Sequence, residues 1–123
     1  MLKAFFHVVH ATTFSYAGLK HLLRRELAAR IEVFAGIAAL VWFLLLRRSI
    51  LEILVLLILF CILISVEALN TAVERIVDRI SPDITEFGRD TKDLGSTAVF
   101  FMLTASGLYI LAITADAAGL IAL

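Results

Sequence analysis

The sequence has one cysteine and no surplus of either charge, and each of these two features excludes a class of protein. Cys61 cannot form an internal disulfide, so a small disulfide-stabilised fold is excluded, and we expect this thiol to pack as a small core side chain. Eleven basic residues balance eleven acidic ones. Because a nucleic-acid binder needs a basic surface, we expect no nucleic-acid partner.

Glycine is also sparse, and the six glycines fit neither of the two glycine-rich motifs that bind nucleotide phosphates. Apolar residues, in contrast, make up 62% of the chain. The mean hydropathy is +1.01, whereas about 45–50% apolar residues are usual in a soluble domain. A chain this small cannot bury so much apolar surface in water, so lipid is the expected solvent.

Three stretches are apolar enough to enter a bilayer: residues 33–46, 53–66 and 97–123, the last with Asp116 as its one charge. A helix needs about 20 residues to cross the hydrocarbon core, so the first two must extend into their flanks. The chain is therefore predicted to be a single-domain, all-α membrane protein over residues 1–123. Its predicted helices are an amphipathic surface helix at 1–25 and transmembrane helices at about 27–46, 50–78 and 94–121.

Two short segments separate the predicted spans. Residues 47–49 are too few for anything but an antiparallel turn between the first two. Pro82 ends the second span, since proline lacks an amide hydrogen. Residues 83–92 are expected to form a polar loop or a short surface helix. Nine of the eleven basic residues fall before the first span or between the second and third, which predicts a cytoplasmic N-terminus. Trp42 and Phe43 then fit an outer aromatic belt.

A polar stripe runs along the end of the second span. At about 100° per residue, Glu67, Asn70, Glu74 and Asp78 share one face within about 80°. A carboxylate costs about 2.5–3.5 kcal/mol to insert in a bilayer, so the stripe needs a partner, either a divalent metal or a basic residue.

Other charged residues are expected at the same level, namely Glu26, Glu32, Lys92 and Asp93, and all of them can converge with the stripe on one interfacial site. Phosphoryl transfer requires a carboxylate near the hydroxyl, Mg²⁺ on the phosphates and a cation, and this set contains each type. The pattern also fits purely structural roles. These are helix-to-helix hydrogen bonds for Glu67 and Asn70, ion pairs for Glu74 and Asp78, and snorkelling of the Lys92 side chain toward the membrane surface.

Two segments, EALNTAVERIVDR at residues 67–79 and KDLGSTAV at 92–99, closely resemble the signature of the prokaryotic integral-membrane diacylglycerol kinases, whose Gram-positive relatives act as undecaprenol kinases. The segments at 15–19, 25–26 and 30–32 also fit, so the resemblance covers about residues 5–115. It implies a surface helix plus three transmembrane helices, assembled as a homotrimer with active sites shared between subunits.

The resemblance also implies roles for individual residues. It gives Glu67 as the general base, with Asn70, Lys92 and Asp93 as further catalytic or nucleotide residues. Glu26 and Glu74 are implied as ligands of the Mg²⁺ bound to ATP. Ser15 and Gly18 are implied as nucleotide contacts of the surface helix. Asp78 and Glu32 match acidic positions of the family without a definite role.

The chain departs from the family pattern at three positions near the nucleotide end. His7 stands where an arginine is frequent, Phe14 where a tyrosine faces the adenine, and Ile31 where a glutamine precedes Glu32. These departures touch only the nucleotide end and leave the phosphoryl-transfer residues in place.

The resemblance predicts ATP-dependent phosphorylation of diacylglycerol to phosphatidic acid in the bacterial inner membrane. Undecaprenol or another polyprenol is the alternative acceptor. An ion-coupled membrane subunit is a rival of another class, but a relay needs polar residues through the bilayer, and here they gather at one end. A noncatalytic assembly factor is the third reading, and it would show no ATP dependence.

Overall fold

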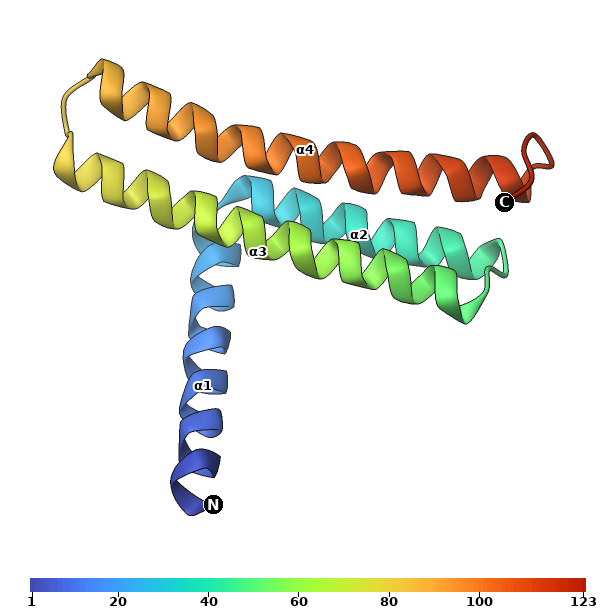
Figure 1. The fold of residues 1–123 in the computed structure, drawn as a ribbon, viewed down its shortest axis with the longest axis horizontal. Helices are drawn as coiled ribbons and strands as arrows, with labels where there is room; N and C mark the ends of the chain where they lie inside the picture. The colour runs from blue at the N-terminus through green and yellow to red at the C-terminus, as the bar shows by residue number, and fades with distance from the viewer.

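The computed structural model describes all 123 residues and is entirely helical (Figure 1). Helices α2, α3 and α4 run side by side, and α1 projects away from them at the start of α2. Each of α2, α3 and α4 is long and apolar enough to cross a membrane. The predicted all-helical fold with three spans is confirmed. The helices are α1 (Leu2–Arg25), α2 (Leu27–Leu45), α3 (Ile50–Ile80) and α4 (Glu86–Ala117).

A tight turn joins α2 to α3, as the sequence predicts. Ser49 is the N-cap of α3: its hydroxyl accepts from the backbone N–H of Glu52 at 3.3 Å, and the Glu52 carboxylate accepts from the Ser49 N–H at 2.7 Å. This reciprocal capping box satisfies two amide groups that the first turn of a helix leaves unpaired. The α3 helix therefore starts at a fixed point directly after α2.

The turn between α3 and α4 is shorter than the sequence suggests. Helix α3 ends at Ile80, before Ser81 and Pro82, as expected. The Thr85 side chain then accepts from the Gly88 N–H at 3.0 Å and caps α4, which starts at Glu86. The prediction of a polar loop or separate surface helix over residues 83–92 is wrong from Glu86 onward, because these residues belong to α4. The predicted membrane span of about 94–121 stays a prediction. Hydropathy indicates whether a segment lies in lipid or in water. It does not mark where a helix begins, because polar residues continue a helix as readily as apolar ones do.

The apolar core lies at the far end of the bundle from α1. Phe43, Leu56 and Ile113 are buried there, with Phe43 wholly enclosed and its ring centroid 5.9 Å from that of Tyr109. Phe43 is thus a core residue rather than part of an aromatic belt. Trp42 stays partly exposed and donates its indole N–H to the Thr114 hydroxyl at 3.1 Å.

A charged cluster closes the same end of the bundle. The Arg48 guanidinium donates to the Glu52 carboxylate, and also to Asp116 Oδ2 at 2.6 Å. These hydrogen bonds, the one to Glu52 first, raise the pKa of Arg48 above its ordinary value. Asp116 also accepts from the backbone N–H of Leu123 at 3.1 Å. The cluster ties the α2–α3 turn to the C-terminal end of α4.

The outward faces of the helices are apolar and uncovered. Only eleven of the 123 residues are buried, and large apolar side chains are exposed along every helix. Cys61 is among the exposed residues, so the expectation that it packs inside the core is wrong for the single chain. Such faces require lipid or another protein chain to cover them.

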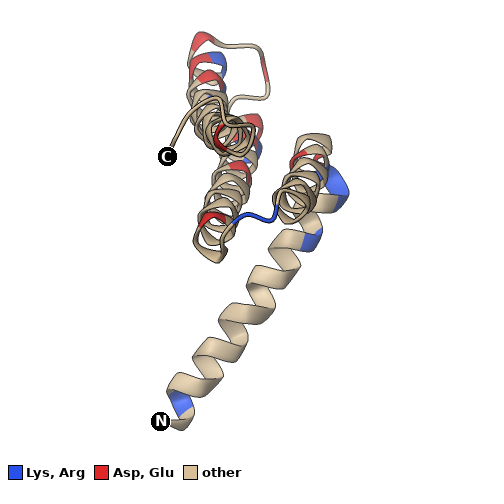
Figure 2. Ribbon diagram, turned by 90° about the vertical axis from the view of Figure 1, so that its right-hand side faces the viewer, with Lys and Arg blue, Asp and Glu red and all other residues tan.

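Helix α1 touches the bundle only near its C-terminal end. Leu22 is its one buried residue, and His21 Nε2 lies 2.6 Å from the Arg75 guanidinium on α3. Figure 2 looks nearly along the bundle and shows basic segments at the junction of α1 and α2, with acidic segments on α3 and α4.

Candidate functional site

A polar cleft lies where the start of α2 meets the second half of α3. Its volume is about 340 Å³, and Glu26, Glu67, Asn70 and Glu74 provide its carboxylate and amide groups. Helix α3 has 31 residues, about 46 Å of helix at 1.5 Å per residue, whereas the hydrocarbon core is about 30 Å thick. Helix α3 is therefore longer than a membrane span requires. The remaining lining residues are Ala28, Thr71, Ser96, Val99, Phe100 and Leu103.

Glu26 is held at the elbow between α1 and α2. Its backbone is extended, with φ −105° and ψ 117°, and its N–H donates to the Leu22 carbonyl at 2.9 Å. The break in the helix at this single residue lets its side chain line the cleft beside α3. A residue far from the stripe in sequence thus joins it in space.

Glu67 is the most enclosed carboxylate of the cleft, with 4% of its surface exposed. Glu26 and Glu74 line the same cleft. One turn further along α3, Asn70 Nδ2 donates to Glu74 Oε1 at 3.4 Å. Glu67, Asn70 and Glu74 therefore form one continuous polar face, as the helical spacing predicts. The three carboxylates that line this cleft give it a negative charge.

Asn70 is seated against Gly95 of α4. Its Oδ1 atom is buried without a hydrogen-bond partner, and a Cβ atom on Gly95 would collide with it. Gly95 therefore lets α4 approach the amide closely. The sequence alone assigns no role to Gly95, which belongs to the KDLGSTAV segment. Its position three residues after Lys92, on the helix that faces the polar stripe of α3, is the sequence feature that points to this contact.

Lys92 and Asp93 line a neighbouring cleft of about 300 Å³ at the turn between α3 and α4. Lys92 Nζ donates to Asp78 Oδ1 at 2.5 Å, so the ion-pair reading of Asp78 is confirmed. The Lys92 side chain is 39% exposed and that of Asp78 is 65% exposed. Both remain accessible to a soluble ligand that enters from the aqueous side.

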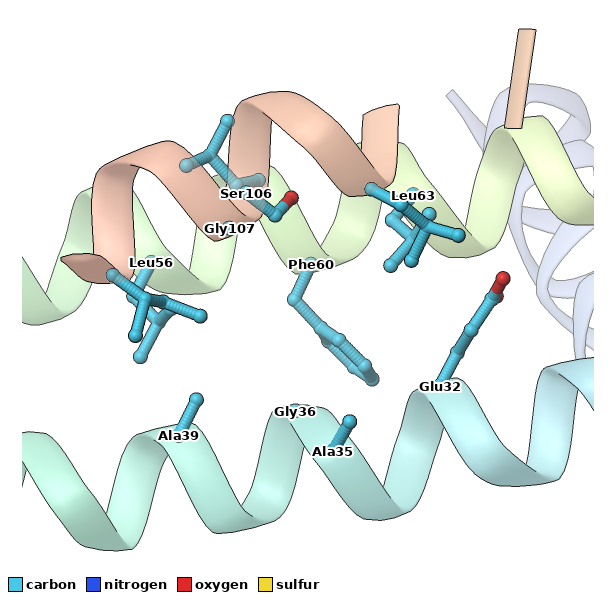
Figure 3. A pocket seen from close by; sticks show the side chains of 12 residues that line it. Glu32, Ala35, Gly36, Ala39, Leu56, Phe60, Leu63, Ser106 and Gly107 are labelled. Carbon is cyan, nitrogen blue, oxygen red and sulfur yellow. The ribbon is translucent and has the colours of Figure 1, made fainter. Parts of the chain in front are cut away.

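Glu32 lies apart from both clefts, in an apolar cavity of about 210 Å³ between α2, α3 and α4 (Figure 3). It is 6% exposed, and its Oε2 atom has no hydrogen-bond partner. The expectation that all these groups converge on one site is therefore wrong. Glu32 lies on α2, whose rotation turns this side chain into the cavity between α2, α3 and α4 rather than into the cleft.

Ser15 and Gly18 do not reach the acidic cleft of their own chain. Both lie on α1 and are exposed, and the Ser15 hydroxyl donates to the Ala11 carbonyl at 2.9 Å. Neither residue lines any of the three cavities of the bundle. Contacts between Ser15 or Gly18 and a ligand in this cleft therefore require another arrangement of chains.

Nowhere does the chain bring three or more His, Cys, Asp or Glu side chains into an arrangement that can hold a metal ion by itself. The cleft instead offers the carboxylates of Glu26, Glu67 and Glu74. Mg²⁺ is usually bound in this way, by one or two carboxylates plus the phosphates of a substrate. The donor set therefore fits a metal that arrives with a phosphate ligand.

Three helices able to span a membrane, with carboxylates gathered at one end, define a multi-pass membrane protein. The chain matches the family described as prokaryotic diacylglycerol kinase over residues 13–114. It is 40% identical over 103 residues to a diacylglycerol kinase of Sinorhizobium sp, which covers 84% of this chain and 74% of that relative.

Two further relatives carry the same name. A diacylglycerol kinase of Haemophilus influenzae is 32% identical over 102 residues, covering 83% of this chain and 86% of the relative. One of Pseudomonas aeruginosa is 37% identical over 98 residues, covering 79% of each. The chain belongs to the prokaryotic diacylglycerol kinase family and is a membrane lipid kinase.

Proposed function

We propose that this kinase transfers the γ-phosphate of ATP to the free hydroxyl of diacylglycerol and releases phosphatidic acid and ADP. The main support is Glu67, a buried carboxylate that lines the acidic cleft. Leu103 lines both this cleft and the apolar cavity, so the two spaces adjoin. In this proposal the lipid hydroxyl reaches Glu67 from the side of the apolar cavity, and the nucleotide phosphate reaches it through the cleft.

Glu67 acts as the general base in this proposal. Its carboxylate accepts the proton of the lipid hydroxyl while the hydroxyl oxygen bonds to the γ-phosphorus. The bond from that phosphorus to the bridging oxygen breaks, and ADP leaves with the electron pair. Positioned proton transfer of this kind contributes about 10²–10⁴-fold to a rate. No phospho-enzyme is needed, since acceptor and donor occupy one site.

Glu26 and Glu74 hold the Mg²⁺ that accompanies ATP. Both carboxylates line the cleft, and hard oxygen ligands suit this ion. When bound, the metal neutralises charge on the transferring phosphate. The Asn70 side chain orients Glu74 through their hydrogen bond. Lys92 and Asp93 border the phosphates from the adjoining cleft, where Lys92 offsets negative charge.

The working enzyme is proposed to be a homotrimer in which α1 of one subunit covers the cleft of another. Two observations support shared sites. Ser15 and Gly18 lie outside the cleft of their own chain, and the helix faces are apolar and uncovered. In such an assembly the amphipathic α1 lies on the membrane surface, and Ser15 and Gly18 contact the nucleotide.

The site is proposed to face the cytoplasm from the inner membrane. Nine of the eleven basic residues belong to α1, the start of α2, the end of α3 and the start of α4, the same end as the cleft. Basic residues accumulate on the cytoplasmic side of spans. ATP is supplied from that side, so the charge pattern and the substrate agree.

Undecaprenol is the alternative acceptor, since an apolar cavity that adjoins the acidic cleft accepts a prenyl chain as well as an acyl chain. An ion relay is disfavoured because the middle of each span lacks a continuous polar path. The deciding experiment is transfer of labelled γ-phosphate from Mg-ATP to both lipids, side by side in mixed micelles. Label in phosphatidic acid supports the proposal. Label only in undecaprenyl phosphate moves the acceptor, and label in neither lipid refutes it.

A further inference from the structure

The aromatic ring of Phe60 projects from α3 into the apolar cavity and meets α2 at Gly36 (Figure 3). Ala35 and Ala39 flank Gly36, so α2 presents only small side chains to the ring. Leu56 and Leu63 lie on either side of Phe60 along α3. The ring therefore stands across the length of the cavity and divides it.

Gly36 and Phe60 depend on one another. A Cβ atom placed on Gly36 would lie 2.5 Å from both Cδ2 and Cε2 of Phe60, far inside van der Waals contact. Any larger residue at position 36 would force the ring to another rotamer. The pair thus fixes how far the cavity stays open beyond the ring.

The chemistry of the cavity identifies its occupant as a lipid chain with a polar head. Its lining is mostly apolar, and apolar cavities of about 150 Å³ bind apolar groups; this one is about 210 Å³. Two buried atoms that belong to its lining residues lack hydrogen-bond partners, Glu32 Oε2 on α2 and Ser106 Oγ on α4. The Ser106 hydroxyl can donate to an ester carbonyl. Leu103 lines both spaces, so the cavity adjoins the cleft that Glu67 lines.

We propose that Phe60, held against Gly36, determines the length and bulk of the acyl chain that the kinase accepts. The occupant is the acyl chain of the diacylglycerol whose hydroxyl reaches Glu67, so this inference rests on the proposed function. A chain that ends before the ring fits without strain. A longer or branched chain must displace the ring, at a cost that rises with its bulk.

The test compares kcat/KM for dihexanoyl-, dioctanoyl-, didecanoyl- and dioleoylglycerol at saturating Mg-ATP, with undecaprenol as a branched acceptor. Phe60→Ala should raise the ratio of long-chain to short-chain kcat/KM about tenfold, the order that one or two methylene groups command in an apolar pocket. Gly36→Ala should lower the same ratio. Gly36→Ala combined with Phe60→Ala should recover it, because the ring that clashes is gone. Phe34→Ala is the matched control. Phe34 lies on α2 and is 75% exposed, so this substitution should leave the ratio of long-chain to short-chain kcat/KM unchanged.

The outcomes separate this inference from the function on which it rests. If the wild-type enzyme labels none of these lipids, the proposed function fails. If the wild type labels diacylglycerol and Phe60→Ala keeps its chain-length profile, the role of Phe60 is refuted. Sizing of each purified variant in detergent gives a further check. If Phe60→Ala changes the oligomeric state and loses kcat/KM equally for every chain length, another subunit fills the cavity. That result would also overturn the proposal.

Discussion

The Oδ1 atom of Asn70 occupies the space that a Cβ atom on Gly95 would need. The amide of α3 and the backbone of α4 are therefore in direct contact beside the acidic cleft. Asn70 in turn donates to Glu74, so a shift of α4 at this point passes to a proposed metal ligand.

Gly95→Ala should displace Asn70 and lower kcat by up to about a hundredfold, because a misplacement of about 1 Å near a reacting centre has that effect. The measurement is turnover at saturating lipid and Mg-ATP, with circular dichroism to confirm the helices. Leu94→Ala, on an exposed face one residue earlier, is the control and should retain activity. Full activity in Gly95→Ala would show that the close contact has no catalytic consequence.

Glu74→Gln should increase the concentration of free Mg²⁺ needed for half-maximal activity by about tenfold or more, the range typical for groups that support a bound metal. The reason is the loss of one carboxylate from the proposed metal site. The measurement is a titration of free Mg²⁺ at constant ATP. Asp90→Asn removes a charge from the exposed surface of α4 and should leave the titration unchanged. Identical curves for Glu74→Gln and the wild type would remove Glu74 from the metal site.

Arg48→Ala should weaken the bundle without altering the chemistry. The substitution leaves the Glu52 and Asp116 carboxylates facing one another without their shared cation, at the end of the molecule opposite the cleft. We expect faster thermal inactivation and an unchanged KM for ATP at low temperature. Arg47→Ala is the matched control, since Arg47 is exposed and forms no ion pair. A variant with wild-type thermal inactivation would show that this cluster is dispensable.

Much of the fold follows from local signals in the sequence. The apolar runs give the three spans, Pro82 ends α3, and the short segment before Ile50 imposes an antiparallel turn. The start of α4 was missed because hydropathy falls at Glu86 while the Thr85 cap already begins the helix. Phe43 was misplaced because its burial depends on Tyr109, which is distant in sequence.

Part of the site was also predictable from local signals in the sequence. Periodicity on one helix places Glu67, Asn70 and Glu74 together, and the structure agrees. Contacts between helices were not predictable in this way. The pairing of Lys92 with Asp78 was only one of several alternatives, and the separate cavity of Glu32 depends on how α2 is rotated against α3. The contact of Gly95 with Asn70 likewise depends on how closely α3 and α4 approach one another.

The central claim is that Glu67 deprotonates a lipid hydroxyl for attack on ATP. It is tested most directly by transfer of labelled γ-phosphate to diacylglycerol by Glu67→Gln, compared with the wild type at equal amounts of folded protein. The account predicts that the variant keeps its helices and oligomeric size while kcat falls by about 10²–10⁴-fold. Transfer at the wild-type rate by Glu67→Gln would contradict it.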